Sequence, residues 1–271
     1  MSRGKKLLLI LLMLVGVGIL AYPGISNGIN RLHGSYAIEE FEIRVENADI
    51  ALERRKAEKY NQDIRNSIPA DGFSGEADKV ETVYYDTLDF GGGMMGYLRI
   101  PKIDVNLPIY HGTDEEILAK GVGHLSQSAL PIGGEGNHSV LTGHTGLPSA
   151  KLFNDLTELK EGDLFHIGIL GEMLTYQVDR IKVVLPSEGQ DLTSVSGEDY
   201  CTLVTCTPYG INTHRLLVRG HRIETLGTEP DTAGNRMVKQ NNGYLWLIGV
   251  SLTLLLLVFL IILKIDISSY A

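Results

Sequence analysis

Two long segments near the two ends of the chain contain no charged residue, and they limit the possible folds more than any other feature. They are residues 7–22 and residues 244–263. The second has about the length that an α-helix needs to cross a bilayer, so we predict a transmembrane helix there. The first follows Arg3, Lys5 and Lys6 and is either a membrane anchor or a cleaved signal peptide. The small residues after it form no clean Ala-x-Ala cleavage site, which favours a retained anchor.

The positions of the positive charges predict how the chain is oriented in the lipid bilayer. The three basic residues before the first segment keep the N-terminus in the cytoplasm, and Lys264 after the second segment agrees weakly. Residues 23–243 are then expected outside the cell, in a two-pass protein of the cell membrane. The formal net charge is −9 and no basic block is present, so nucleic acid is not favoured as a partner.

Between the two apolar segments, the pattern of apolar residues changes from helical to extended. Residues 30–66 carry apolar side chains at helical spacing among many charges, which predicts one or two helices. From residue 94 onward the apolar runs are short and β-like, with short helices expected at 114–120 and 150–159. The expected strands are residues 94–100, 105–111, 139–143, 164–170, 173–185, 200–206 and 213–223.

About eight strands with few helices favour a closed barrel over a layered α/β fold. We therefore predict a mainly β protein: an eight-stranded closed β-barrel with N-terminal helices and short connecting helices, flanked by two transmembrane helices. The expected parts are a cytoplasmic tail with a signal or anchor (1–22), a helical region with a loop (23–93), the barrel (94–225), a linker (226–243), a second transmembrane helix (244–263) and a cytoplasmic tail (264–271).

Cys206 ends a β-branched run, residues 202–206, that is followed by a turn with Pro208 and Gly210. The next strand returns with Arg215, so a nucleophile and a cation able to hold an oxyanion are expected on neighbouring strands, as acyl transfer requires. The other cysteine, Cys201, is five residues away along the same strand. At roughly 16 Å and on opposite faces, the two thiols cannot form a disulfide. An inert core thiol is the alternative for Cys206 and the preferred interpretation of Cys201.

His144 is the best candidate for a catalytic base among the eight histidines. It lies at a predicted strand end between Gly143 and Gly146, where the backbone can turn and leave the side chain accessible. The alternatives lie within or beside strand patterns and lack this setting; they are His138, His166, His214 and His221. The alternation of side chains along a strand does not show which of Arg215 and Arg219 is the catalytic arginine, because both are expected on the same face.

The run Thr202-Leu-Val-Thr-Cys206 resembles the Thr-Leu-x-Thr-Cys signature of sortases, and Arg215 lies where that family has its arginine. The Thr-Gly-His144 segment resembles the family's histidine motif, and the two apolar spans resemble those of class C, pilus-associated sortases. The resemblance implies that Cys206 attacks the Thr–Gly carbonyl of an Leu-Pro-x-Thr-Gly-like sorting signal, His144 protonates the leaving amine and Arg215 stabilises the oxyanion. It also implies pilin substrates and an acceptor lysine on another pilin.

The same resemblance implies a lid over the active site. Class C sortases often carry an Asp-Pro-aromatic lid motif, and the matching residues here are Asp71, Gly72 and Phe73. Glycine frees the backbone where proline would fix it, so we expect a looser lid; an ordinary turn is the alternative. No metal-ligand cluster is visible, and we expect no metal and no cofactor.

Two other functions remain open from the sequence. One is a sortase that attaches surface proteins to peptidoglycan, although the second span and the lid favour pilus polymerisation. The other is a non-catalytic binding domain of the cell envelope, in which Cys206 would be dispensable.

Overall fold

The computed structural model describes residues 3–64, 82–224 and 249. Apart from residue 249, the predicted second span lies outside these residues, and so do the predicted lid residues Asp71 and Phe73. The chain divides into two compact units, Asn30–Thr228, and Met1–Ile29 together with Glu229–Ala271.

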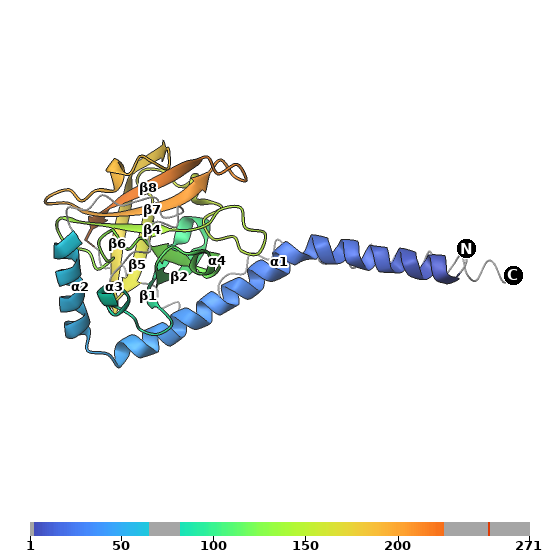
Figure 1. Cartoon of the computed structure of the whole chain (residues 1–271), viewed down its shortest axis with the longest axis horizontal. Helices are drawn as coiled ribbons and strands as arrows, with labels where there is room; N and C mark the ends of the chain where they lie inside the picture. Colours follow the sequence, from blue (N-terminus) through green and yellow to red (C-terminus); the bar gives the residue numbers. More distant parts are fainter. Residues whose placement is uncertain (1–2, 65–81, 225–248, 250–271) are drawn as a thin grey trace. The chain divides into compact units, whose positions relative to one another are not determined.

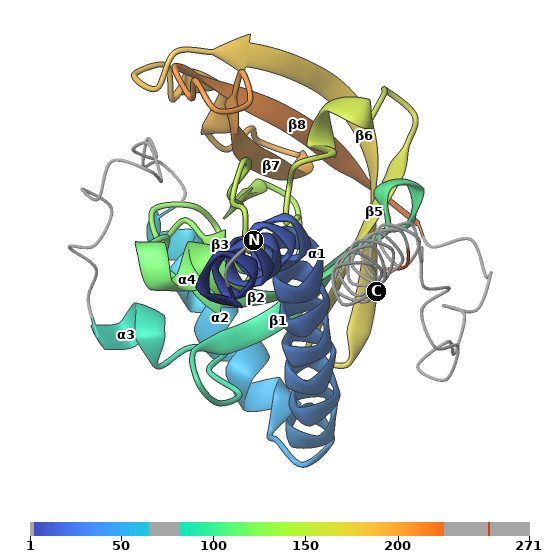
Figure 2. The ribbon, with the colours of Figure 1, turned by 90° about the vertical axis from the view of Figure 1, so that its right-hand side faces the viewer.

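The unit Asn30–Thr228 is built around a closed barrel whose strand order is β1-β2-β3-β4-β7-β8-β6-β5, which confirms the predicted fold class. Two neighbouring pairs, β2–β3 and β4–β7, are parallel, and the others are antiparallel. β7 lies between β4 and β8 (Figure 1), and Figure 2 shows β7 and β8 side by side from another direction. The strands are β1 (Met94–Ile100), β2 (Val105–His111), β3 (Val122–His124), β4 (Asn137–Thr142), β5 (Leu164–Ile169), β6 (Glu172–Val184), β7 (Asp199–Thr207) and β8 (His214–Ile223).

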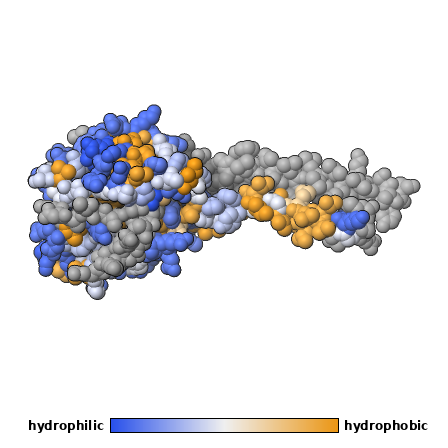
Figure 3. Space-filling model, turned by 45° about the horizontal axis from the view of Figure 1, so that its top comes forward, coloured by the Kyte–Doolittle hydropathy of each residue, from blue (hydrophilic) through white to orange (hydrophobic). Residues whose placement is uncertain are grey.

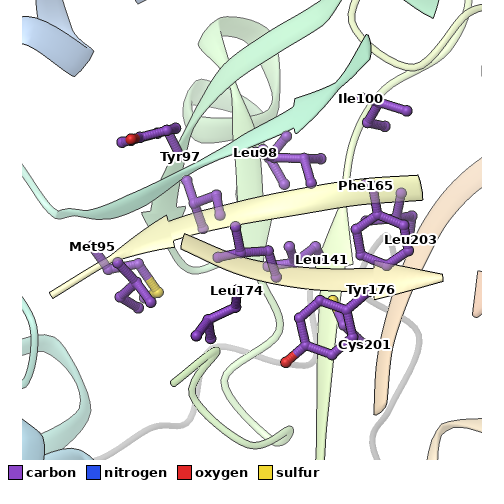
Figure 4. Close-up of a cluster of buried hydrophobic side chains, with 14 of the residues drawn as sticks. Met95, Tyr97, Leu98, Ile100, Leu141, Phe165, Leu174, Tyr176, Cys201 and Leu203 are labelled. Carbon is purple, nitrogen blue, oxygen red and sulfur yellow. The ribbon is translucent and has the colours of Figure 1, made fainter. Parts of the chain in front are cut away.

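The barrel interior is filled by large side chains from strands distant in the sequence. Phe165 of β5 and Tyr176 of β6 are wholly buried and stack with ring centroids 5.4 Å apart. Leu98, Leu203 and Cys201 are also wholly buried and lie in the same cluster (Figure 4). Each large apolar side chain that leaves water contributes about 1.5–3 kcal/mol, so this core holds the strand ends in fixed positions.

Two helices pack outside the barrel within this unit, as the helical spacing predicts. The last turns of α1 (Arg3–Glu46) bury Ile38, Phe41 and Val45, and the Phe41 ring lies 6.1 Å from that of Tyr97. α2 (Ile50–Ile64) is tied to the barrel by Asn61, whose side chain bonds both the N–H and the carbonyl of Leu130.

The first part of α1 exposes apolar side chains to its surroundings, including Leu8, Leu12 and Leu20. Figure 3 shows hydrophobic surface, in orange, along this part of α1. By length and composition this helix is able to cross a membrane, in agreement with the first predicted span.

The prediction of a helix over residues 150–159 is wrong. Leu152 takes a positive φ of 37°, and the Phe153 N–H donates to the His144 carbonyl at 3.0 Å. Helical geometry is therefore confined to the short 3₁₀ segment η2 (Leu156–Glu158). Two more 3₁₀ segments, η1 (Pro101–Ile103) and η3 (Gln190–Leu192), connect strands.

The short helices elsewhere match the sequence more closely. α4 (Glu115–Lys120) forms where a helix was predicted, and the Asp114 side chain caps it by accepting from the Ile117 N–H. α3 (Thr82–Tyr85) buries Tyr84 against the barrel. The three-residue strand β3 was not predicted, because Gly121 and Gly123 interrupt its apolar pattern.

Candidate active site

Cys206 and Arg215 are direct partners in the β7–β8 ladder. Both lie at the end of the strand pair joined by the loop of residues 208–213, which we call the near end; the opposite end, where β7 begins at Asp199, is the far end. Cys206 is 9% exposed. The register therefore confirms that a thiol and a guanidinium occupy neighbouring strands.

His144 follows the end of β4, the strand on the other side of β7. The ladder continues past β4, because the Gly143 N–H donates to the Val204 carbonyl at 3.0 Å. The Thr205 hydroxyl then donates to the Gly143 carbonyl at 2.6 Å. Thr205 precedes Cys206 in β7, and Gly143 precedes His144 in the chain, so this bond brings the His144 loop close to Cys206. Cys206, Arg215 and His144 therefore all lie at the near end, on or directly after three adjacent strands.

The position before His144 requires a glycine. A Cβ on Gly143 would lie only 2.6 Å from the Phe153 ring, which covers this turn. The loop after His144 is fixed by Asn154, whose Oδ1 accepts from the Gly146 N–H at 2.7 Å and from the Thr145 hydroxyl at 3.2 Å. The packing of one aromatic ring and the bonds of one amide thus set the backbone on which His144 stands.

Two features of the surroundings of His144 shift its pKa in opposite directions. Burial lowers the pKa of His144 below the usual value, and the carboxylate of Glu115 at the start of α4 acts to raise the pKa. The net shift is downward, which favours the neutral imidazole. A neutral ring can take a proton from a thiol and return it to a leaving group.

Arg215 and Arg219, which the sequence could not separate, have different environments. Arg215 is opposite Cys206, and its Nη1 donates to the carbonyls of Asn212 and His214, each at 3.3 Å. Arg219 is opposite Thr202 and donates to both carboxylate oxygens of Asp179 at 3.0 and 2.6 Å. Arg219 is thus the ion-pair residue, and only Arg215 lies beside the thiol.

Cys201 lies in the barrel core, in agreement with the structural interpretation. It is wholly buried, and burial raises its thiol pKa well above the usual value, with a smaller effect from Asp199. Neither Cys201 nor Cys206 is part of a disulfide bond. A buried thiol with a raised pKa carries little thiolate and is a poor nucleophile.

Two of the alternative histidines, His138 and His166, have structural partners. His138 Nδ1 donates to the Thr193 carbonyl at 3.0 Å, and its Nε2 accepts from the Thr202 hydroxyl at 2.7 Å. Burial lowers the pKa of His138 to about 4, so the ring stays neutral. His166 bonds the Thr175 hydroxyl at 3.0 Å.

Sequence reasoning missed three residues that shape this site: Thr205, Glu115 and Asn154. Thr205 belongs to the motif that ends at Cys206, but its bond to a loop 62 residues away is visible only in the fold. The sequence gives no sign that Glu115 acts on His144, and no pattern in the sequence singles out Asn154. Among the described residues, no group of three or more His, Cys, Asp or Glu is arranged to hold a metal ion.

The chain is similar to several known proteins. Residues 98–223 match the family model of the sortase domain. Sortase C-1 from Streptococcus pneumoniae is 47% identical with a TM-score of 0.65, and the match covers 69% of this chain and 98% of that chain. A pilus-related sortase C of Group B Streptococcus is 41% identical with a TM-score of 0.64, over 69% and 97% of the two chains. Sortase D of Bacillus subtilis is 33% identical over 135 residues, which cover 49% of this chain and 65% of the relative. The chain therefore belongs to the sortase family of cysteine transpeptidases, and its solved neighbours are sortases C.

Proposed function

We propose that this protein is a membrane-anchored pilus sortase that joins pilin subunits. The Cys206 thiolate attacks the carbonyl between Thr and Gly of an Leu-Pro-x-Thr-Gly-like sorting signal, and Arg215 stabilises the oxyanion that forms. His144 donates a proton to the leaving amine as the C–N bond breaks, which leaves a thioester on Cys206. The neutral amine of a lysine on another pilin then attacks the thioester and passes its proton to His144, and the C–S bond breaks to release the Cys206 thiolate.

The observation that carries this proposal is the register that brings Cys206, Arg215 and the His144 loop to the near end of three adjacent strands. The likeness to a solved sortase C described as pilus-related supports the pilin substrate. Anchoring rests on the apolar part of α1 and on the uncharged segment at residues 244–263, which together give a two-pass protein with the barrel outside the cell.

The direct test traps the intermediate. The full-length protein in detergent is incubated with a sorting-signal peptide, and the acyl adduct is located by mass spectrometry after proteolysis. The adduct is expected on Cys206, and a Cys206→Ala variant is expected to form none. Cys201→Ala is the matched control, because Cys201 is a core residue of the same strand and its loss should leave the adduct in place. An adduct on Cys201, or none on either thiol, contradicts the assignment.

A second experiment separates pilus polymerisation from attachment to peptidoglycan. The enzyme is incubated with purified pilin and, separately, with pilin and a cell-wall peptide that presents an amine. A ladder of covalent pilin oligomers supports polymerisation. Transfer only to the cell-wall peptide supports attachment and contradicts the pilus assignment while leaving the sortase chemistry intact.

A further inference from the structure

The second half of β6 has a neighbouring strand on one side only. β5 pairs with β6 as far as Gln177, whereas β8 pairs with it as far as Val184. The Val178 backbone is still bonded on the β5 side, to residues 162 and 163. Residues 180–184, which we call the β6 edge, pair with β8 alone within the described part of the chain. In an antiparallel pair every second residue directs its N–H and carbonyl away from the partner, so the β6 edge presents backbone groups that β8 does not use.

The side chains along the β6 edge are apolar on one face and cationic on the other. Ile181 and Val183 are 36% and 56% exposed and lie on one face, and Leu185, directly after the strand, is 48% exposed. Arg180 and Lys182 are also exposed and lie on the other face. Exposed apolar side chains beside unpaired backbone groups are the features by which the edge of a sheet pairs with another chain.

The β6 edge lies close to the candidate active site. Val184 is opposite Arg215 in the β6–β8 ladder, and Arg215 is opposite Cys206 in the β7–β8 ladder. Neighbouring strands are about 4.8 Å apart, so the end of the β6 edge is roughly 10 Å from the strand that carries the thiol. A chain added to this edge therefore runs beside the groups that are proposed to react.

The cationic face limits which chain can pair with the β6 edge. Lys182 Nζ lies 2.5 Å and Arg180 Nη1 lies 3.6 Å from the carboxylate of Asp191. Two cations share one carboxylate, which leaves an excess of positive charge on this face. Lysines on an edge protect it against indiscriminate pairing. An acidic side chain on the added strand turns the same charge into an attractive cross-strand contact.

A second copy of this chain is a poor partner for the β6 edge. Two copies related by a two-fold axis pair their edges antiparallel. In the register that pairs the whole edge, Lys182 of one copy is opposite Lys182 of the other. Like charges directly opposite each other destabilise a strand pair. The occupant therefore has a different sequence, with an acidic side chain where this chain has a lysine.

We propose that the β6 edge docks an extended segment of a pilin substrate as an added strand. The segment presents apolar side chains to the Ile181 and Val183 face and at least one acidic side chain to Lys182. Its backbone hydrogen bonds supply affinity, and the alternation of its side chains supplies selectivity. This inference rests on the proposed function: it assigns a docking surface for the pilin that is distinct from the residues that react.

The direct test follows the exchange of backbone amides on β6. The full-length Cys206→Ala variant in detergent, which cannot form the thioester, is mixed with a purified pilin that carries a sorting signal, and hydrogen–deuterium exchange is measured by mass spectrometry. Amides of residues 180–184 are expected to exchange at least about tenfold more slowly when the pilin is bound. Residues 175–177 are the internal control, because β5 and β8 already pair with them on both sides.

Two results of the exchange experiment overturn the proposal. One is unchanged exchange at residues 180–184 at every pilin concentration. The other is slow exchange in the absence of pilin that becomes slower as the enzyme concentration rises, because this result assigns the β6 edge to a second copy of the chain.

Variants test the charge and the apolar face of the β6 edge separately. Lys182→Glu places an acid opposite the acidic side chain of the pilin and should weaken pilin binding, measured by calorimetry, at least about tenfold. Val183→Thr keeps a β-branched side chain but removes apolar surface, and should weaken binding about threefold. It also keeps the test valid if Lys182→Glu fails to fold.

The matched control for these variants is Lys56→Glu, because Lys56 is an exposed lysine on α2 that pairs with Glu53 at 2.6 Å. Its binding of pilin should equal that of the unmodified protein. Unchanged binding in both edge variants, or an equal loss in the Lys56 variant, contradicts the assignment of the β6 edge.

A kinetic measurement separates this inference from the proposed function. In the enzyme that retains Cys206, Lys182→Glu should slow the pilin ladder at least about tenfold below saturation and leave adduct formation by a short sorting-signal peptide unchanged. If the peptide forms no adduct on Cys206 of the unmodified enzyme, the proposed function fails, and the exchange experiment still decides the docking inference. If Lys182→Glu slows the peptide and the pilin equally, the docking inference fails and the proposed function survives.

Discussion

Two arginines on β8, four residues apart, are held in different ways at the two ends of the β7–β8 pair. Towards the far end, Arg219 donates to both oxygens of Asp179 and lies 4.0 Å from the Tyr200 ring centroid. At the near end, Arg215 is opposite Cys206 and donates to backbone carbonyls of the loop that carries it. Arg219 is fixed by a charged partner and a ring, whereas Arg215 is positioned by a turn.

The difference shows that the role of an arginine on this strand pair depends on which residue of the neighbouring strand it lies opposite. The far end contains a network in which His138, Thr202 and Arg219 bond to other side chains, and it contributes to stability. The near end uses backbone bonds and the Thr205 hydroxyl to set the position of the groups that are proposed to react. Variants at the far end should therefore change mainly the free energy of unfolding, and variants at the near end should change mainly the catalytic rate.

The largest expected effect is a contrast between the two arginines. Arg215→Gln removes the proposed oxyanion donor and should lower kcat/KM for a sorting-signal peptide by about 10²–10³-fold, with little change in stability. Arg219→Gln breaks a two-point, largely buried ion pair and should lower the free energy of unfolding by about 1–3 kcal/mol, with kcat/KM per folded molecule retained. Peptide kinetics and urea denaturation measure the two effects. Equal losses of activity in the two variants would contradict the distinction.

The next largest effect is the dependence of stability on pH at the far end. Burial lowers the pKa of His138 to about 4 in the folded protein, against 6.5 for an ordinary histidine. The unfolded chain binds the proton more readily between these values, so stability is lost as the pH falls from about 6.5 to 4. His138→Gln should reduce the difference in unfolding free energy between pH 7 and pH 4 by about 3 kcal/mol. An unchanged difference in urea denaturation would refute this role for His138.

A smaller effect on catalysis is expected at Thr205, which we regard as a positioning residue. Thr205→Val leaves the Gly143 carbonyl without its 2.6 Å hydrogen bond and should lower kcat about tenfold with KM nearly unchanged, because the His144 loop loses its fixed position. Thr205→Ser restores the hydroxyl and should recover most of kcat. An equal loss of kcat in both variants would show that the hydrogen bond to the Gly143 carbonyl does not determine the catalytic rate.

The smallest effect concerns the charge on His144. Because the Glu115 carboxylate raises the pKa of His144 against the dominant effect of burial, Glu115→Gln should lower this pKa further. The protonated fraction of His144 at a given pH then falls, and the acidic limb of the pH–rate profile moves to lower pH. NMR titration of the His144 ring measures the shift, with Glu116→Gln, the neighbouring carboxylate on α4, as control. An equal shift in both variants would indicate a general charge effect.

Much of the barrel was predictable because its strands carry local signals. The hairpin formed by β5 and β6 surrounds Gly171, which has a positive φ of 76°, and the turn after Cys206 contains Gly210 and Asn212, both also with positive φ. The position of Cys206 relative to Arg215 followed from the short loop between their strands. These features depend on residues close together in the chain.

The parts that were missed depend on residues far apart. The parallel pairing of β4 with β7 brings the His144 loop beside Cys206, and no local pattern encodes it. The predicted helix at 150–159 failed for the same reason: the apolar spacing is helical, but the Phe153 ring packs on Gly143 and its N–H bonds the His144 carbonyl. A cavity at the far end of β7, lined by residues of α2, β7 and β8, also arises only when these elements come together.

The parallel neighbours β4 and β7 have a consequence for how the enzyme is made. The bond between Thr205 and Gly143 joins residues 62 positions apart, with β5 and β6 synthesised between them. Contacts of such long sequence separation form slowly, because a large loop must close first. A nascent chain that ends shortly after β4 therefore contains His144 but does not yet contain Cys206. In the proposed mechanism, a chain therefore becomes reactive only after synthesis has passed residue 206 and the last strands have joined.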